Sequence, residues 1–289
     1  NFLAVKNNIK KLYHNNRIIN ELTNNITNSR HISCLGLTGS SKAFVVASVS
    51  DIIGGQNFII CSDKEQAAYF YNDLENIFEE KELDYSKKRV LFYPTSYKRP
   101  YEPEKVDNTY ILSRTEVLQR LSSSDRKTIV VTYPEALSEK VITRKTMSNS
   151  TFKWSVGDNI SIDALTDKLA DLNFEHVDFV VEPGQFAIRG GIVDVFSFSN
   201  DYPYRIEFFG DEIDSIRSFN PIDQLSIEKL KEICLIPNLQ DYNEDYERES
   251  IFQFLKKQSL IWIEEEHCLE ERIKNEYEKA VGVFDSLQT

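Results

Sequence analysis

Glycine and cysteine are both scarce in this sequence, with 10 glycines and four cysteines in a chain of 289 residues. The cysteines form no C-x-x-C pair and no dense pattern, so we expect a reduced, cytoplasmic chain without a disulfide framework. No apolar run reaches the roughly 18 residues of a membrane span, and no signal segment opens the chain. The four histidines lack metal-ligand spacing. A secreted, membrane-bound or metal-dependent protein is therefore not expected.

Positive charge is also in short supply, because 34 basic residues face 46 acidic ones and the formal net charge is −12. Such a chain is a poor default ligand for phosphate backbones, which disfavours nucleic-acid binding by the chain on its own. The acidity is uneven, since residues 1–137 carry 18 basic and 16 acidic side chains and residues 138–289 carry 16 and 30. Because the chain begins at Asn1 rather than Met and ends just after a helical pattern, we expect an excised piece of a longer protein.

Short apolar runs alternate with helical patterns in the first half of the chain, after a polar helix predicted within residues 1–28. The strand-like runs lie at residues 32–35, 58–61, 90–93 and 129–132. Helical patterns follow at residues 44–49, after 63 and around 111–121. Strands that alternate with helices are typical of a parallel α/β sheet.

The pattern changes after residue 137 to closely spaced strands. A short helix at 165–172 precedes strand-like runs at 177–181, 186–189, 192–198, 204–209 and 213–219, which predict an antiparallel meander. The end returns to α/β patterns, with strands at 233–236 and 260–263 and helices at 249–257 and 269–280. The predicted fold class is α/β: a degenerate P-loop, helicase-like parallel-sheet domain (1–137 and 219–289) interrupted by a small α+β insertion (138–218).

A glycine-containing segment stands between a predicted strand and a predicted helix, where a phosphate-binding loop of the pattern G-x-x-x-x-G-K-[ST] belongs. Gly36 and Lys42 match the pattern, and Gly39 lies inside it. Ser41 replaces the second glycine, and Ala43 replaces the hydroxyl that holds Mg²⁺. We predict a degenerate loop that is kept for packing and does not hydrolyse nucleotide. Weak nucleotide or anion binding and plain coincidence are the alternatives.

The run after residue 260 is similar to the strand-plus-acid motif of helicase-type ATPases. Glu264 stands where an aspartate contacts Mg²⁺, and Glu265 stands where a glutamate activates water. The extra methylene of Glu264 displaces a group whose placement matters. Alternatively, these acids only open the following helix. No catalytic residue and no cofactor is assigned, and we do not expect ATP and Mg²⁺ to bind productively.

Two longer segments are the most specific pattern in the chain: FAIRGGIVDVF at residues 186–196 and YRIEFFGDEIDSI at 204–216. They resemble segments shared by the nucleotide-excision-repair protein UvrB and the amino-terminal, UvrB-like region of the bacterial transcription-repair coupling factor (Mfd). The resemblance extends upstream through Pro94-Thr95 and residues 100–103, and downstream to Pro237. The degenerate loop, and the lack of the long aromatic hairpin of UvrB, favour the coupling factor.

This resemblance implies a non-enzymatic recruitment module of transcription-coupled repair. Such a module binds UvrA through its inserted small domain and brings nucleotide-excision repair to a stalled RNA polymerase. RNA polymerase and DNA are then contacted by other domains of a longer chain, whose carboxy-terminal domains are also expected to contact the module. The alternative is a residual nucleotide-binding half of a helicase-like repair protein.

The resemblance also implies which residues bind the partner. The predicted partner-binding residues are Arg189, Phe196, Arg205, Glu207 and Glu175. Glu175 stands where some coupling factors have an arginine, and Ala187 stands where UvrB has one, so the contact set can be smaller than in the relatives. Arginine suits such a face because it makes bidentate, stacked contacts. The alternatives are a cross-strand salt bridge for Arg205 and Glu207, and turn support for Arg189.

Overall fold

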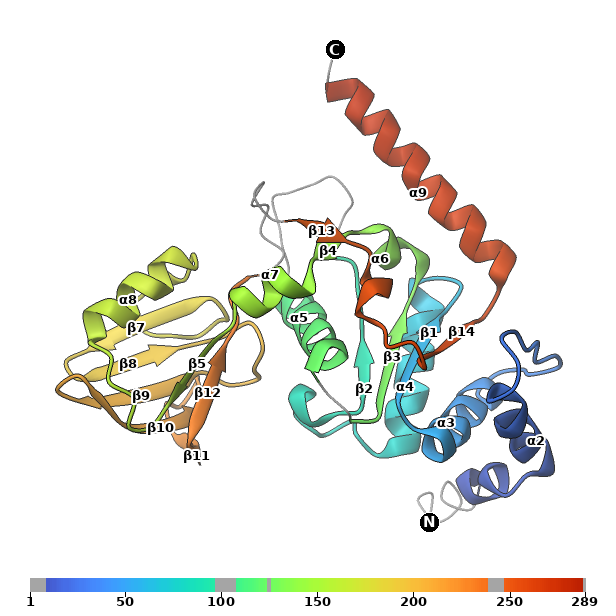
Figure 1. Cartoon of the computed structure of the whole chain (residues 1–289), viewed down its shortest axis with the longest axis horizontal. Helices are drawn as coiled ribbons and strands as arrows, with labels where there is room; N and C mark the ends of the chain where they lie inside the picture. Colours follow the sequence, from blue (N-terminus) through green and yellow to red (C-terminus); the bar gives the residue numbers. More distant parts are fainter. Residues whose placement is uncertain (1–8, 97–107, 124–125, 239–246, 288–289) are drawn as a thin grey trace. The chain divides into compact units, whose positions relative to one another are not determined.

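The computed structural model describes residues 9–96, 108–123, 126–238 and 247–287, so the motif predicted at residues 100–103 lies outside the described residues. The chain divides into two compact units (Figure 1). The first unit comprises Asn1–Pro94, Gln119–Ser138 and Phe254–Thr289. The second unit comprises Thr95–Leu118 and Glu139–Gln253.

A four-stranded parallel sheet forms the centre of the first unit, with the strand order β14-β1-β3-β2. The strands are β1 (Gln56–Ile60), β2 (Val90–Phe92), β3 (Thr128–Thr132) and β14 (Leu260–Ile263). Every residue of β1 and β3 is buried, which is typical of parallel strands covered on both faces. Because β14 pairs with β1, the chain after the insertion completes this sheet, as the predicted α/β class requires.

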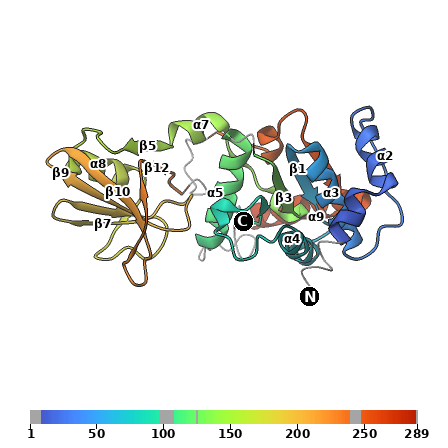
Figure 2. The same cartoon turned by 90° about the horizontal axis from the view of Figure 1, so that it is seen from below.

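The first unit also contains helices. They are α2 (Arg17–Ile26), α3 (Ser41–Ile53), α4 (Lys64–Phe78), α6 (Pro134–Ser138) and α9 (Glu266–Leu287), while α5 (Asn108–Ser123) has residues in both units. Seen from below, α2 lies beside α3 (Figure 2), and Ile19 of α2 packs with Val45 and Val49 of α3. Asp63 caps α4 by accepting a hydrogen bond from the backbone N–H of Gln66.

Two predictions for the first part and the end of the chain are wrong. Residues 32–35 form no strand: they lack a ladder, and Leu35 is 91% exposed. A four-residue run is too short a signal to outweigh the loop glycines that follow it. The helix predicted at 249–257 is instead the short strand β13 (Arg248–Glu249) and the 3₁₀ turn η2 (Ile251–Phe254). Only its two ends, Ile251 and Phe254, are buried, so the segment lacks the repeated apolar face of a longer helix.

A six-stranded sheet dominates the second unit, with the order β11-β10-β9-β8-β7-β6. Its strands are β6 (Glu175–His176), β7 (Gln185–Arg189), β8 (Ile192–Val195), β9 (Tyr204–Phe209), β10 (Glu212–Phe219) and β11 (Ser226–Leu230). All neighbours are antiparallel except β6 and β7, so the sheet is mixed. The strand predicted at 177–181 is not formed, because the chain leaves the sheet after β6.

One face of this sheet, the inner face, packs against α8 (Ile162–Asp171) and a two-stranded sheet of β5 (Phe152–Ser155) and β12 (Glu232–Leu235). The core between them contains Trp154, Leu165, Leu169, Phe174, Phe186, Val193, Val195, Tyr204, Ile206, Ile213, Ile216, Ile233 and Leu235. Alternate residues of each strand therefore point to the opposite face, which we call the outer face.

The smaller elements complete the description of the chain. They are η1 (Tyr85–Lys87), β4 (Val141–Ile142), which pairs with β13, and α7 (Arg144–Asn149). The insertion predicted to end at residue 218 continues in the structure, because residue 218 lies inside β10 and is followed by β11 and β12. The turn at 220–225 connects β10 to β11, and these two strands pair antiparallel. The sheet therefore extends past the predicted boundary.

Candidate functional site: the phosphate loop and the outer face

The loop before α3 has two glycines in the left-handed region and a serine that hydrogen-bonds within the loop. Gly36 and Gly39 have φ angles of +79° and +54°, a region that glycine adopts without strain. Ser41 Oγ accepts a hydrogen bond from the N–H of Thr38 at 2.9 Å and donates one to its carbonyl at 2.6 Å. Ala43 is fully buried. One backbone donor of the loop is therefore already satisfied within the chain.

Lys42 and Glu264, which the sequence places 222 residues apart, form an ion pair. Their Nζ and Oε1 atoms are 2.6 Å apart, with the two side chains 36% and 12% exposed. The N–H of Ser62 donates to the other oxygen of Glu264 at 3.0 Å. Burial alone raises the pKa of Glu264, but the hydrogen bonds from Lys42 and Ser62 and the ammonium charge outweigh it, so the pKa lies below its ordinary value.

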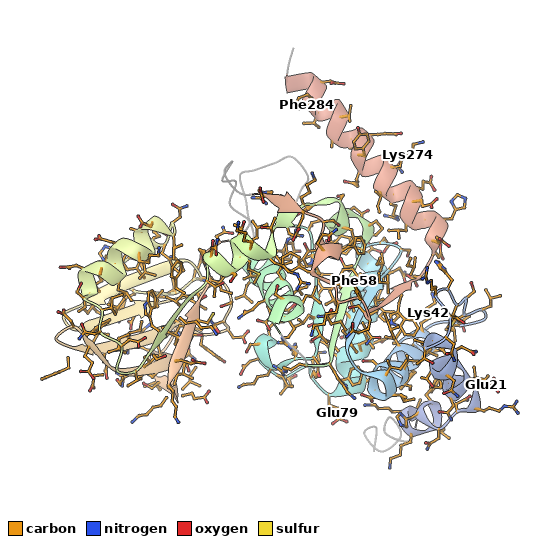
Figure 3. The ribbon with its side chains drawn as sticks, viewed as in Figure 1. Glu21, Lys42, Phe58, Glu79, Lys274 and Phe284 are labelled. Carbon is orange, nitrogen blue, oxygen red and sulfur yellow. The ribbon has the colours of Figure 1, made fainter. Side chains whose placement is uncertain are left out.

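The ion pair lies where the parallel sheet meets the first turn of α3. Glu264 follows β14, and its N–H donates to the carbonyl of Ile60 at the end of β1. Figure 3 labels Lys42 near the start of α3 and Phe58 within the sheet. Glu265 is exposed and accepts a hydrogen bond from the thiol of Cys268 in the first turn of α9. The ammonium of Lys42 is therefore held by a carboxylate of the chain, and Glu265 lies at the start of a helix.

The outer face of the six-stranded sheet holds the predicted arginines together on one carboxylate. Asp194 in β8 is 1% exposed. It accepts a hydrogen bond from Nη2 of Arg189 in β7, and two from Arg205 in β9, from Nε at 2.7 Å and from Nη2 at 2.9 Å. The hydrogen bonds to Asp194 raise the pKa of Arg205, although partial burial opposes them. Two guanidinium groups thus share a single buried carboxylate.

Aromatic rings lie beside both guanidinium groups. The ring centre of Phe179 is 5.2 Å from Arg189, and that of Phe219 is 4.3 Å from Arg205. Phe179 is 60% exposed, whereas Phe219 is fully buried. The side chain of Arg205 is 14% exposed and that of Arg189 is 37% exposed. Arg189 is therefore the more accessible of the two arginines that bind Asp194.

Glu207 takes part in a cross-strand interaction, but not with Arg205. It accepts hydrogen bonds from Ser215 and Arg217 of β10, next to β9. Arg217 itself stands opposite Arg205 in the register, and Lys229 of β11 stands opposite Arg217. The cross-strand row from Asp194 to Lys229 therefore carries three cations and one carboxylate.

The other two predicted partner-binding residues have different surroundings. Phe196 is 5% exposed and packs with Val180 and Ala187 in a small apolar cluster on the outer face. Ala187 stands at the position where UvrB is expected to have an arginine. It is 1% exposed and packs in this apolar cluster. Glu175 is exposed in the edge strand β6. The geometry thus brings Arg189, Arg205 and Glu207 to the outer face, where Phe196 packs in a buried apolar cluster.

Sequence reasoning missed Asp194 as a site residue. The signal was present, because Asp194 lies between Val193 and Val195, and strand alternation places a residue flanked by two core residues on the opposite face. The role of Gln224, whose Oε1 accepts a hydrogen bond from Arg205 at 2.9 Å, had no comparable signal. It depends on the shape of a turn.

No helix in the described part of the chain is long and apolar enough to cross a membrane. Within the same residues, no group of three or more histidine, cysteine, aspartate or glutamate side chains is arranged to hold a metal ion.

Comparison with known proteins adds a family to this geometry. Residues 152–240 match the UvrB interaction domain. The transcription-repair-coupling factor of Bacillus subtilis (strain 168) is 32% identical over 202 residues, which cover 70% of this chain and 16% of that protein. The same factor of Escherichia coli (strain K12) is 28% identical over 201 residues, covering 70% of this chain and 17% of that protein.

UvrABC system protein B is similar to the chain as well. The protein of Thermosipho africanus (strain TCF52B) is 28% identical over 207 residues, which cover 70% of this chain and 31% of that protein. The chain thus spans less than a third of each of these curated relatives. Residues 152–240 therefore match the UvrB interaction domain, and 70% of the chain is similar to transcription-repair-coupling factors and to UvrABC system protein B.

Proposed function

We propose that this chain is a non-catalytic recruitment module of a transcription-coupled repair factor and that it binds UvrA through the outer face of its six-stranded sheet. The observation that carries the proposal is the sharing of buried Asp194 by Arg189 and Arg205. It lies inside the region that matches the UvrB interaction domain. One carboxylate balances only one of the two guanidinium charges, and the more exposed guanidinium belongs to Arg189.

This arrangement suits recognition of a protein. Asp194 and the ring of Phe179 restrict Arg189 before any partner arrives, which lowers the entropy cost of binding. Arginine beside an aromatic ring is enriched among the residues that dominate interface energies. A carboxylate of UvrA would complete the charge balance that Asp194 leaves open.

The parallel-sheet unit then serves as a scaffold and not as an enzyme. The Lys42–Glu264 ion pair supports this part of the proposal, because a phosphate group would have to compete with a carboxylate 2.6 Å from the lysine. The same pair opposes the alternative of a residual nucleotide-binding half. In this proposal RNA polymerase and DNA are contacted by other domains of a longer protein, whose carboxy-terminal domains also contact the module.

Titration calorimetry of the chain with purified UvrA tests the proposal. We expect Arg189→Ala to weaken the affinity by about tenfold or more, because it removes the accessible guanidinium. Arg17→Ala is the matched control, since Arg17 is 90% exposed on α2 of the other unit. Unchanged affinity for UvrA in Arg189→Ala, with the control also unchanged, would contradict the proposal.

The nucleotide alternative has its own test. Titration with ATP and Mg²⁺ is expected to show no micromolar binding, for the unaltered chain and for Lys42→Ala alike. Micromolar binding that Lys42→Ala abolishes would instead support a working phosphate loop.

A further inference from the structure

The turn between β10 and β11, residues 220–225, holds two large apolar side chains in solvent. Ile222 is 92% exposed and Leu225 is 66% exposed. Single exposed apolar residues are ordinary on a protein surface. Two on one tight turn, beside the cationic outer face, form a surface that a partner can bury.

This turn is held in a single shape by its own hydrogen bonds. The N–H of Gln224 donates to the carbonyl of Asn220 at 2.8 Å, and the N–H of Asn220 donates to the carbonyl of Leu225 at 2.9 Å. The side-chain oxygen of Asn220 accepts from the N–H of Ile222 at 2.9 Å. Gln224 has a φ of +62°, which a residue other than glycine adopts only where its surroundings compensate. Ile222 is thus presented on an ordered backbone.

The compensation comes from the outer face. The side chain of Gln224 donates from Nε2 to the carbonyl of Pro221 at 2.8 Å and accepts at Oε1 from Nη2 of Arg205 at 2.9 Å. Arg205 in turn binds Asp194, which holds Arg189. A continuous set of hydrogen bonds therefore connects the turn with the proposed partner-binding arginine.

We propose that the 220–225 turn is a second anchor of the same interface, in which Ile222 and Leu225 enter an apolar pocket of UvrA that is rimmed by carboxylates. This inference rests on the proposed function, and it names the chemistry of the partner surface. On the outer face the cations Arg189, Arg205, Arg217 and Lys229 outnumber the carboxylates Asp194 and Glu207, and this surplus of positive charge is what an acidic rim complements. An apolar anchor in a pocket, surrounded by polar contacts, is the usual arrangement of a protein interface.

Ile222→Ser and Leu225→Ser test this inference in the same calorimetric titration. We expect Ile222→Ser to weaken binding to UvrA by about tenfold and Leu225→Ser by less, because Ile222 is the more exposed of the two. Neither change is expected to alter the melting temperature by more than about 1 °C, since exposed side chains add little to stability. Tyr69→Ser is the matched control, because Tyr69 is 69% exposed on α4 of the other unit.

The outcomes separate the two proposals. Weaker binding in Ile222→Ser with an unchanged Tyr69→Ser control supports the second anchor. Weaker binding in Arg189→Ala with full affinity in Ile222→Ser overturns the second anchor and leaves the proposed function standing. Full affinity in both variants overturns both. Sedimentation that shows a dimer dissociated by Ile222→Ser, with unchanged affinity for UvrA, assigns the turn to a second copy of this chain and overturns the inference.

Discussion

Each unit of this molecule has a carboxylate that is paired across strands or helices, and the two carboxylates differ in how many cations they hold. Glu264 in the parallel-sheet unit meets one cation, Lys42, and uses its second oxygen for the N–H of Ser62. Asp194 in the six-stranded unit meets two, Arg189 and Arg205. The Lys42–Glu264 pair has no net charge. The cluster of Asp194 with two arginines keeps one positive charge, and Arg189 is its more exposed cation.

This difference accounts for the division of labour that we propose. A phosphate loop needs an unpaired lysine and free backbone donors, and here the lysine has a carboxylate and one loop donor has the hydroxyl of Ser41. A docking face needs a charged group that is held in place but not neutralised. Strand alternation on the six-stranded sheet supplies it, because the same strands bury valine on one face and Asp194 on the other.

Removing Asp194 is expected to have the largest effect on stability. Asp194→Ala leaves two guanidinium groups without their carboxylate, and breaking a buried pair in this way costs about 3–5 kcal/mol. Glu207→Ala is the control: it removes a carboxylate that is 31% exposed and paired with an arginine that is 28% exposed, so we expect a cost of about 1 kcal/mol or less. Urea denaturation measures both. Equal losses of unfolding free energy in the two variants would contradict the prediction that burial makes the Asp194 cluster more important for stability than an exposed ion pair.

Substitutions of two glycines compare packing in the six-stranded unit with that in the loop before α3. Gly184 has a φ of +88°, and a Cβ there would lie 2.6 Å from Cζ of Phe198, a buried ring. Gly36 has a φ of +79° with nothing within 4 Å of a Cβ. We expect Gly36→Ala to cost about 1 kcal/mol for backbone strain alone, and Gly184→Ala to cost about 2–4 kcal/mol because overpacking adds to that strain. Thermal unfolding distinguishes them, and a larger loss in Gly36→Ala would contradict the packing argument.

Acid should weaken the Lys42–Glu264 pair in a defined pH range. Because folding lowers the pKa of Glu264 from its ordinary value of 4.5, the stabilisation is fully present above about pH 4.5 and is lost as the pH falls through the lowered pKa. Lys42 is 36% exposed, so solvent screening limits the effect to about 1 kcal/mol. We expect the unfolding free energies of the unaltered chain and Glu264→Gln to differ by a constant amount from pH 7 to 5 and to converge below that.

The comparison of the two proteins isolates Glu264 from other acids. Burial raises the pKa of Asp51, but the hydrogen bonds from Arg89 and Lys10 outweigh this effect, so the pKa lies below its ordinary value. Asp51 therefore also loses its stabilising effect as the pH falls. Its contribution is equal in both proteins and cancels in the difference. A difference that grows on acidification would contradict the assignment.

The sequence predicted the two-part architecture because both sheets carry strong periodic signals. The apolar run at 129–132 became the buried strand β3 and the alternating run at 204–209 became β9, since buried and alternating strands leave clear patterns. The wrong predictions concern structure that depends on residues far away in the sequence.

Leu35 lies in an apolar run typical of a strand, yet no strand in the described part of the chain pairs with it. The pairing of Lys42 with Glu264, and of Arg205 with Gln224 rather than Glu207, depends on contacts between distant segments that spacing does not encode.

Restoring the phosphate-loop sequence is expected to have the smallest effect. Ser41→Gly combined with Ala43→Ser returns the loop to the pattern G-x-x-x-x-G-K-S, yet Lys42 still faces Glu264 at 2.6 Å. We therefore expect no ATP hydrolysis above background in a phosphate-release assay, because the change restores residue types without freeing the lysine. Adding Glu264→Gln frees the ammonium and is expected to give weak binding of inorganic phosphate, measured by calorimetry. We again expect no hydrolysis, since this change removes the carboxylate at the position where the motif contacts Mg²⁺. ATP turnover by the Ser41→Gly and Ala43→Ser double variant would show that the loop residues, and not the ion pair, limit nucleotide chemistry in this unit. The difference between the paired Lys42 and the two arginines on Asp194 would then no longer explain the proposed roles of the two units.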